Sequence, residues 1–215
     1  MPDASTLLLF ATAAISINLT PGPDMLYVIA RSVGQGRRAG IVSALGLSVG
    51  YVLHTLLAAS GLAALLASAP GAYGAVRIAG ALYLVYLGMR ALWPRREREA
   101  PDRPAGIAAA PVGDDARWPA VFRQGALTST LNPSIAVFFL AFLPGFVTPA
   151  RGAVAGQVIA LGLLFNATAT TTHTIIALLA GTAGDWLRQR EGAARWQRRF
   201  SGALLILLGL RVLVM

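Results

Sequence analysis

The segment Asn18–Asp24 combines helix-breaking residues with a carboxylate inside an otherwise apolar stretch. Its sequence is NLTPGPD, in which Pro21 and Pro23 have no amide hydrogen and Gly22 loosens the backbone between them. A helix broken here leaves carbonyls upstream and amides downstream without helical partners. The amides lie at the positive end of a helix dipole and suit a carboxylate, whereas the carbonyls suit an ammonium group. The segment therefore predicts a binding site for a small charged metabolite.

Asp24 is the only acidic residue inside any span that we predict below. Inserting an ionised carboxylate at the centre of a membrane helix costs about 2.5 to 3.5 kcal/mol, so an intramembrane acid is expected to have a function. We expect Asp24 to bind an ammonium group or a proton. The alternative is that Asp24 only caps the second half-helix or faces water near Arg31.

A second break is predicted at Asn132-Pro133, again inside an apolar stretch. Taken alone, Pro133 predicts a simple kink in which nearby hydroxyl groups satisfy the freed carbonyls. Its correspondence with Pro21 favours a cavity lined by both breaks. The predicted substrate-binding residues are Asn18, Pro21, Gly22, Pro23, Asp24, Asn132 and Pro133.

His54 and His173 are the only histidines, and both fall inside predicted spans. With Asp24 they form our predicted proton-coupling set, although an intramembrane histidine often serves only as a hydrogen-bonding group between helices. A metal site is weakly supported because no H-x-x-x-H or H-E-x-x-H spacing is present. We predict no metal, no cofactor and no catalytic residue.

The elements that must hold these residues are membrane helices. The chain has 215 residues, of which 56% are hydrophobic and 13% charged. Its mean hydropathy is +0.64. Soluble domains average about 25% charged residues, so a soluble fold is excluded. The absence of cysteine excludes a disulfide framework and a thiolate metal site. Apolar stretches predict six spans, near residues 7–30, 41–67, 72–92, 122–147, 153–182 and 198–215.

The arginines predict the orientation of these spans. All 18 basic residues are arginine: three follow the first span, seven lie between or at the ends of spans three and four, and five lie between spans five and six. The positive-inside rule places these loops in the cytoplasm and both termini outside. This placement also explains the net charge of +9 without a nucleic-acid partner. Residues 94–120 are predicted to be a flexible cytoplasmic linker.

The two halves of the chain resemble each other, which predicts two three-helix repeats at 1–93 and 121–215. An odd number of spans in each half makes the repeats inverted in the membrane, as in many secondary transporters. His54-Thr55 matches His173-Thr174. The matches in the first spans are Phe10, Ala14, Leu19 and Pro21 with Phe122, Ala126, Leu131 and Pro133.

Gly46 and Gly50 form a pair of small residues one helical turn apart. Such a pair indicates close helix packing, and a homodimer contact is the second interpretation.

The chain resembles the LysE/RhtB family of amino-acid exporters over essentially its whole length. The resemblance is carried by NLTPGPDMLYVIARSVGQGRRAG at 18–40, by GALYLVYLG at 80–88 and by FRQGALTSTLNPSIAVFFLAFLPGF at 122–146. Two positions depart from the family pattern: Ser134 stands where a lysine is common, and Gly145 where a glutamine is common. The resemblance implies export of amino acids from the bacterial cytoplasm, coupled to the proton gradient.

These observations together predict an all-helical carrier of the bacterial inner membrane, with six spans, that exports small zwitterionic amino acids. Free amides at the breaks bind the carboxylate, Asp24 binds the ammonium group or a proton, and His54 and His173 tune protonation. The alternatives are a divalent-cation exporter of the same fold, an enzyme acting inside the bilayer, and a scaffold that only binds partners. The particular amino acid is not predicted.

Overall fold

The computed structural model describes residues 2–68 and 118–187, together with single positions in two other segments. Within this part of the chain every regular element is helical, which confirms the predicted fold class there. Most of the predicted spans at 72–92 and 198–215 and nearly all of the linker at 94–120 lie outside the described residues. Nine described positions in those two spans are helical: Ala75, Ile78, Leu82, Val85, Tyr86, Met89, Ala203, Ile206 and Leu210.

The first predicted span is a pair of helices that meet at an angle. Helix α1 (Ala4–Asn18) and helix α2 (Pro23–Gln35) are bent by 58° at the break between them. Asp3 caps α1 by accepting a hydrogen bond of 2.8 Å from the Thr6 amide. Gly36 alone separates α2 from the next helix, and its φ of 85° is a conformation that favours glycine.

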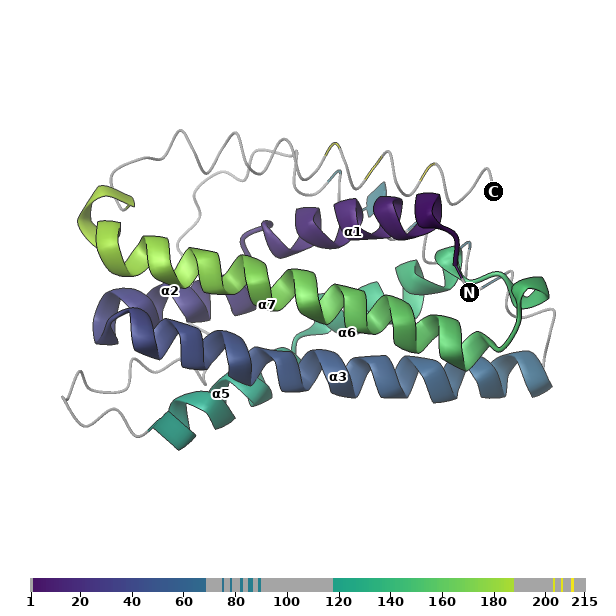
Figure 1. Cartoon of the computed structure of the whole chain (residues 1–215), viewed down its shortest axis with the longest axis horizontal. Coiled ribbons are helices and arrows are strands. Elements are labelled where there is room, and N and C mark those ends of the chain that lie inside the picture. Colours follow the sequence, from purple (N-terminus) through teal and green to yellow (C-terminus); the bar gives the residue numbers. More distant parts are fainter. Residues whose placement is uncertain are drawn as a thin grey trace.

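Two long helices form the centre of the structure. Helix α3 (Arg37–Ser68) and helix α7 (Val154–Leu187) pack against each other along the long axis of the molecule (Figure 1). Each contains 28 residues that are apolar enough to cross a membrane, with mean hydropathies of 1.8 and 1.4. They coincide with the predicted spans at 41–67 and 153–182.

The second broken span is less regular than the first. Helix α5 (Trp118–Thr130) is followed by helix α6 (Pro133–Val137), a π-helical turn η1 (Phe138–Phe142) and a 3₁₀ turn η2 (Leu143–Phe146). The two halves are bent by 48°. A short 3₁₀ turn, η3 (Pro149–Arg151), leads into α7. If each bent pair crosses the membrane once, the described residues contain four spans.

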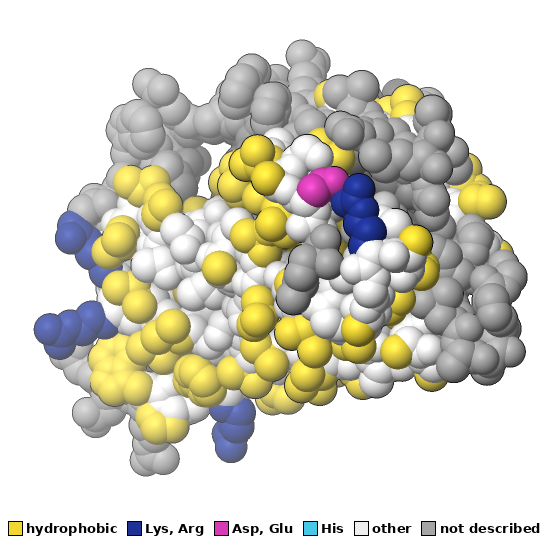
Figure 2. Space-filling model, turned by 45° about the vertical axis from the view of Figure 1, so that its right-hand side comes forward, with side chains coloured by type: hydrophobic (Ala, Val, Ile, Leu, Met, Phe, Trp, Pro, Cys, Tyr) yellow, Lys and Arg dark blue, Asp and Glu magenta, His cyan; other side chains and the backbone are white. Residues whose placement is uncertain are grey.

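The surface is that of a membrane protein. Large hydrophobic side chains such as Leu8, Leu56 and Leu131 are more than half exposed. In Figure 2 hydrophobic side chains are spread over the visible described surface; basic side chains project at its left and lower edges, and another lies beside an acidic side chain away from those edges. Lipid tails are the environment in which such a surface is stable.

Gly46 and Gly50 bring α3 close to α5 of the same chain. A Cβ atom at Gly46 would overlap the backbone of Phe122, and one at Gly50 would overlap the side chain of Ser129. Glycine at these positions therefore serves packing within one chain. The surface that the small residues create is occupied within the chain, and the homodimer stays a prediction.

A cluster of phenylalanine rings joins α1, before the first break, to the turns η1 and η2, which follow the second break. Phe10 of α1 is fully buried, and its ring centroid lies 6.0 Å from that of Phe138, 6.1 Å from Phe142 and 5.3 Å from Phe146. Aromatic pairs at these separations are stabilised beyond their burial alone.

Polar contacts join the same two spans on the α2 side of the breaks. Tyr27 donates a hydrogen bond of 2.7 Å to the carbonyl of Val121. Arg31 donates to Gln124 and to Gln35, and its guanidinium carbon lies 5.4 Å from the centre of the Tyr27 ring.

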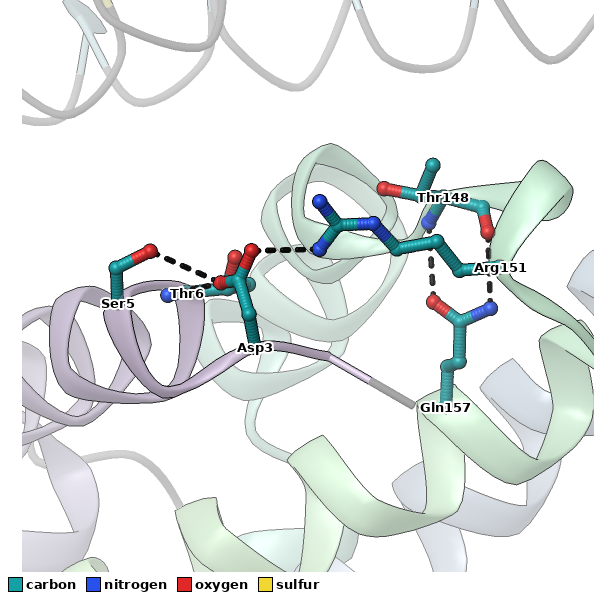
Figure 3. A network of polar contacts seen from close by, with 6 residues as sticks. All are labelled: Asp3, Ser5, Thr6, Thr148, Arg151 and Gln157. Carbon is teal, nitrogen blue, oxygen red and sulfur yellow. Dashed lines mark hydrogen bonds and ion pairs between the residues drawn. The ribbon is translucent and has the colours of Figure 1, made fainter.

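An exposed ion pair ties the start of α1 to η3, and the buried Gln157 holds the neighbouring loop before α7 (Figure 3). Arg151 Nη1 lies 2.6 Å from Asp3 Oδ2, and the amide of Gln157 bonds both backbone groups of Thr148, at 3.0 and 2.9 Å. Hydrogen bonds from Thr6, and then from Arg151, hold the pKa of the Asp3 carboxyl well below its usual range.

Candidate binding site between the two helix breaks

A cavity of about 110 Å³ lies where the two breaks meet. The predicted residues Asn18, Pro21, Gly22, Pro23, Asp24, Asn132 and His173 all line it. Pro133 is exposed and His54 is buried, and neither lines the cavity. Pro133 affects the site through the backbone, because it occupies the first turn of α6. The predicted meeting of the two breaks is therefore present in the structure.

Asp24 joins three helices at one wall of the cavity. Its side chain is 5% exposed. Tyr51 of α3 donates a hydrogen bond of 2.9 Å to Oδ2, and the Asn132 amide donates one of 2.8 Å to Oδ1. Both carboxylate oxygens thus have a donor, which a buried charge requires.

Tyr51 was not predicted from the sequence. It is fully buried, and its ring packs edge-on against Phe165 at 5.3 Å. The signal that could have identified it is its position three residues before His54, since residues at this spacing share one face of a helix.

The two histidines have different surroundings. Nδ1 of His173 lies 3.4 Å from the Tyr51 hydroxyl, and the two rings are stacked. Nε2 of His54 instead donates to the carbonyl of Ser129 at 3.2 Å, and the ring stacks on Phe139. His54 thereby adds a second donor to a carbonyl in the last turn of α5, which also accepts a hydrogen bond of 3.1 Å from the Asn132 amide. Their matching places in the repeat do not give them matching contacts.

The cavity also contains donors that have no partner. Asn18 is 4% exposed, and its Nδ2 atom makes no hydrogen bond to any described residue. Gly22, the N-cap of α2, has no side chain to cap the amides of Asp24 and Met25, and helix geometry gives those amides no partner within α2. These donors suit an acceptor such as a carboxylate.

The charges that line the cavity restrict its chemistry. Among the lining residues Asp24 is the acid and His173 the titratable base, and no lysine or arginine is present. Ser134, which replaces the lysine expected from the family resemblance, lines the cavity. Within the described part of the chain, no three His, Cys, Asp or Glu residues are grouped so that they could hold a metal ion.

Comparison with curated proteins finds relatives among membrane proteins. A leucine efflux protein from Salmonella typhimurium is 33% identical over 138 residues, which are 64% of this chain and 61% of that protein. An uncharacterized membrane protein from Pseudomonas aeruginosa is 28% identical over 94% of this chain and 92% of its own length. One from Bacillus subtilis is 23% identical, with 96% and 97% covered. No solved structure matches the chain.

The comparison with protein families agrees with these relatives and with the broken spans and the cavity between them. The model of the LysE type translocators matches residues 15–215. The chain therefore belongs to the LysE type translocator family.

Proposed function

We propose that the protein is a secondary transporter that exports neutral amino acids or close derivatives from the cytoplasm. One observation carries the proposal: the buried Asp24 carboxylate and the partnerless Asn18 amide line the same cavity between two broken membrane helices. A zwitterion carries an ammonium group that suits the Asp24 carboxylate and a carboxylate that suits the Asn18 amide. The similarity to a leucine efflux protein supports an amino acid as the substrate.

In this proposal the substrate binds by its two charged ends. The ammonium group pairs with Asp24, and the carboxylate accepts from Asn18 Nδ2 and from the first-turn amides of α2. A buried donor without a partner costs about 1 to 3 kcal/mol, and a bound carboxylate relieves that cost. Because no lysine or arginine among the described residues lines the cavity, an acidic side chain on the substrate gains no partner there.

We further propose that transport is coupled to protons through Asp24. A proton and a substrate ammonium group compete for the same carboxylate, so binding of one favours release of the other. His173 is connected to Asp24 through Tyr51, whereas His54 supports the end of α5. Protonation of the site therefore depends on His173 more than on His54.

We propose the following arrangement in the membrane. The chain forms two inverted three-helix repeats, 1–93 and 121–215, joined by the linker 94–120, in the bacterial inner membrane with both termini outside. In each half of the chain a broken span is followed by a long helix: α1–α2 by α3, and α5–α6 by α7. This shared order of elements supports the proposal. Rocking of one repeat against the other exposes the cavity to each side in turn.

The test is transport by the purified protein in proteoliposomes. We expect release of loaded radiolabelled leucine to be driven by an imposed pH gradient, and Asp24→Asn to reduce this release by about 100-fold or more, since the variant lacks the charge that pairs with the ammonium group. Asp3→Asn is the matched control, because it makes the same change at an exposed carboxylate. Release of divalent cations instead of neutral amino acids, or unchanged release by Asp24→Asn, contradicts the proposal.

A further inference from the structure

We infer that Tyr51 transfers the proton that a substrate displaces from Asp24 to His173. This inference rests on the proposed function and adds a residue that neither contacts the substrate nor was expected from the sequence. Tyr51 bonds Asp24 and approaches His173 with the same hydroxyl group, but it does not line the cavity.

The hydroxyl of Tyr51 lies beside both Asp24 and His173 and has one proton to donate. Its oxygen lies 2.9 Å from Asp24 Oδ2 and 3.4 Å from His173 Nδ1. The hydroxyl donates to Asp24 when that carboxylate is charged. When Asp24 is protonated, the acid can donate to the Tyr51 oxygen, and the hydroxyl then turns toward the ring nitrogen of His173.

The surroundings of Tyr51 separate its hydroxyl from the cavity, although Asp24 and His173 both line it. The side chain is fully buried, and the edge-on contact with Phe165 and the stacking on His173 fix the plane of its ring. A substrate that occupies the cavity blocks the direct exit of a proton from Asp24 into water. The Tyr51 hydroxyl provides an exit on the other side of the carboxylate.

The transfer conserves atoms and charge. The O–H bond of protonated Asp24 breaks as its proton binds the Tyr51 oxygen, while the original Tyr51 proton leaves to bind Nδ1 of His173. The products are an Asp24 carboxylate, a neutral tyrosine and an imidazolium on His173. The carboxylate is then ready for the substrate ammonium group, and His173, which lines the cavity, releases the proton to water when the cavity opens.

The other described groups near Asp24 do not offer this path. His54 on α3 lies close enough to Asp24 to interact with its charge, but its Nε2 donates to the carbonyl of Ser129. Asn132 from α6 is neutral. The titratable groups that face Asp24 within the described residues are therefore Tyr51 and His54 from α3 and His173 from α7.

The inference is tested with Tyr51→Phe in proteoliposomes, because phenylalanine keeps the ring and removes only the hydroxyl. Two rates are compared: exchange of labelled for unlabelled leucine at equal pH, which needs no net proton movement, and accumulation driven by a pH gradient. We expect exchange within about 2-fold of wild type and gradient-driven accumulation lower by about 100-fold, the lower end of the effect of a lost proton-transfer group. His173→Gln should give the same separation.

Tyr27→Phe is the matched control, since it also removes a buried tyrosine hydroxyl that bonds across two helices, at a distance from Asp24. It should keep the ratio of the two rates at the wild-type value. Gradient-driven accumulation that survives in Tyr51→Phe overturns the inference, and so does an equal loss of both rates. If wild-type protein exchanges no amino acid, the proposed function itself fails, and the inference fails with it.

Discussion

The two breaks are built differently, although they occupy matching places in the chain. The first extends from Leu19 to Gly22, and the second consists of Leu131 and Asn132. The proline in the first turn after the break is Pro23 in one case and Pro133 in the other. The sequence comparison pairs Pro133 with Pro21, so the longer first break shifts the correspondence by two residues.

The larger difference lies in the caps. Asn132 accepts a hydrogen bond of 3.0 Å from the Ser134 amide and so caps α6. Gly22 provides no side chain for α2. The capped break keeps its own backbone satisfied and uses its remaining amide group to hold Asp24. The uncapped break leaves its amides for a ligand. In the proposed function, the second break therefore supports the site, and the first binds the substrate.

Among the changes that compare the two breaks, removing the cap of the second should have the largest effect. Asn132→Ala deletes both the cap and the donor to Asp24. We expect the lost cap to reduce stability by about 1 kcal/mol. The lost bond to a charged group, worth about 1.5 to 3 kcal/mol, should lower leucine efflux by roughly 10-fold to 100-fold.

Asn132→Ser separates the two contributions of this residue, because serine caps a helix but is too short to replace the bond to Asp24. Its melting temperature should return toward wild type while efflux stays low. If Asn132→Ser restores efflux as well, the second break contributes only its cap, and the bond to Asp24 is dispensable.

Adding a cap to the first break should have an intermediate effect. A side chain at Gly22 has room, since its Cβ would meet only the Thr20 carbonyl oxygen at 3.7 Å. In Gly22→Ser the hydroxyl competes with substrate for the first-turn amides, so we expect the KM for leucine to rise about 5-fold, equivalent to roughly 1 kcal/mol. The melting temperature should not fall.

Gly34→Ser is the control for this prediction, because it places the same side chain elsewhere on α2 where no atom lies within 4 Å. Its KM should equal that of the wild type. An unchanged KM in Gly22→Ser indicates that the amides of α2 do not contact the substrate, and the two breaks are then alike in function.

The ion pair at the start of the first broken span should matter least. Asp3 and Arg151 are about half exposed, and exposed pairs contribute little to stability. Asp3→Asn should leave efflux unchanged and lower the melting temperature slightly at neutral pH. Because the folded-state pKa of Asp3 is lowered, the stabilisation is present above the unfolded pKa and is lost as the pH falls through the folded pKa.

The difference in melting temperature between Asp3→Asn and wild type should therefore persist down to about pH 4, where an ordinary aspartate is half protonated, and disappear only in stronger acid. A difference that disappears near neutral pH contradicts this assignment of the stabilising charge.

The positions of the breaks could be predicted from the sequence because proline and glycine act on the local backbone. Helices α1 and α2 end and begin within the segment Asn18–Asp24, and Asn132 precedes α6 as expected. The long helices were predicted for an equally simple reason, since an apolar stretch of sufficient length is itself the signal for a span.

The contacts of the site could not be predicted, because they depend on how helices rotate against each other. Nothing in the sequence distinguishes His173, which approaches Tyr51, from His54, which bonds the end of α5. The same limit applies to Tyr51, which looks like one more aromatic residue in an apolar helix. The exposure of Pro133 also follows from the rotation of α6 about its axis.

The phenylalanine cluster makes the two broken spans harder to separate on the α1 side than on the α2 side. Separation of α1 from the second broken span would remove Phe10 from the rings of Phe138, Phe142 and Phe146. The apolar surface of these rings would then be exposed to water, which is unfavourable. On the α2 side, water molecules can replace the bonds that Tyr27 and Arg31 make. In the proposed transport cycle, the two broken spans should therefore separate more easily at the polar contacts on the α2 side than at the phenylalanine cluster on the α1 side.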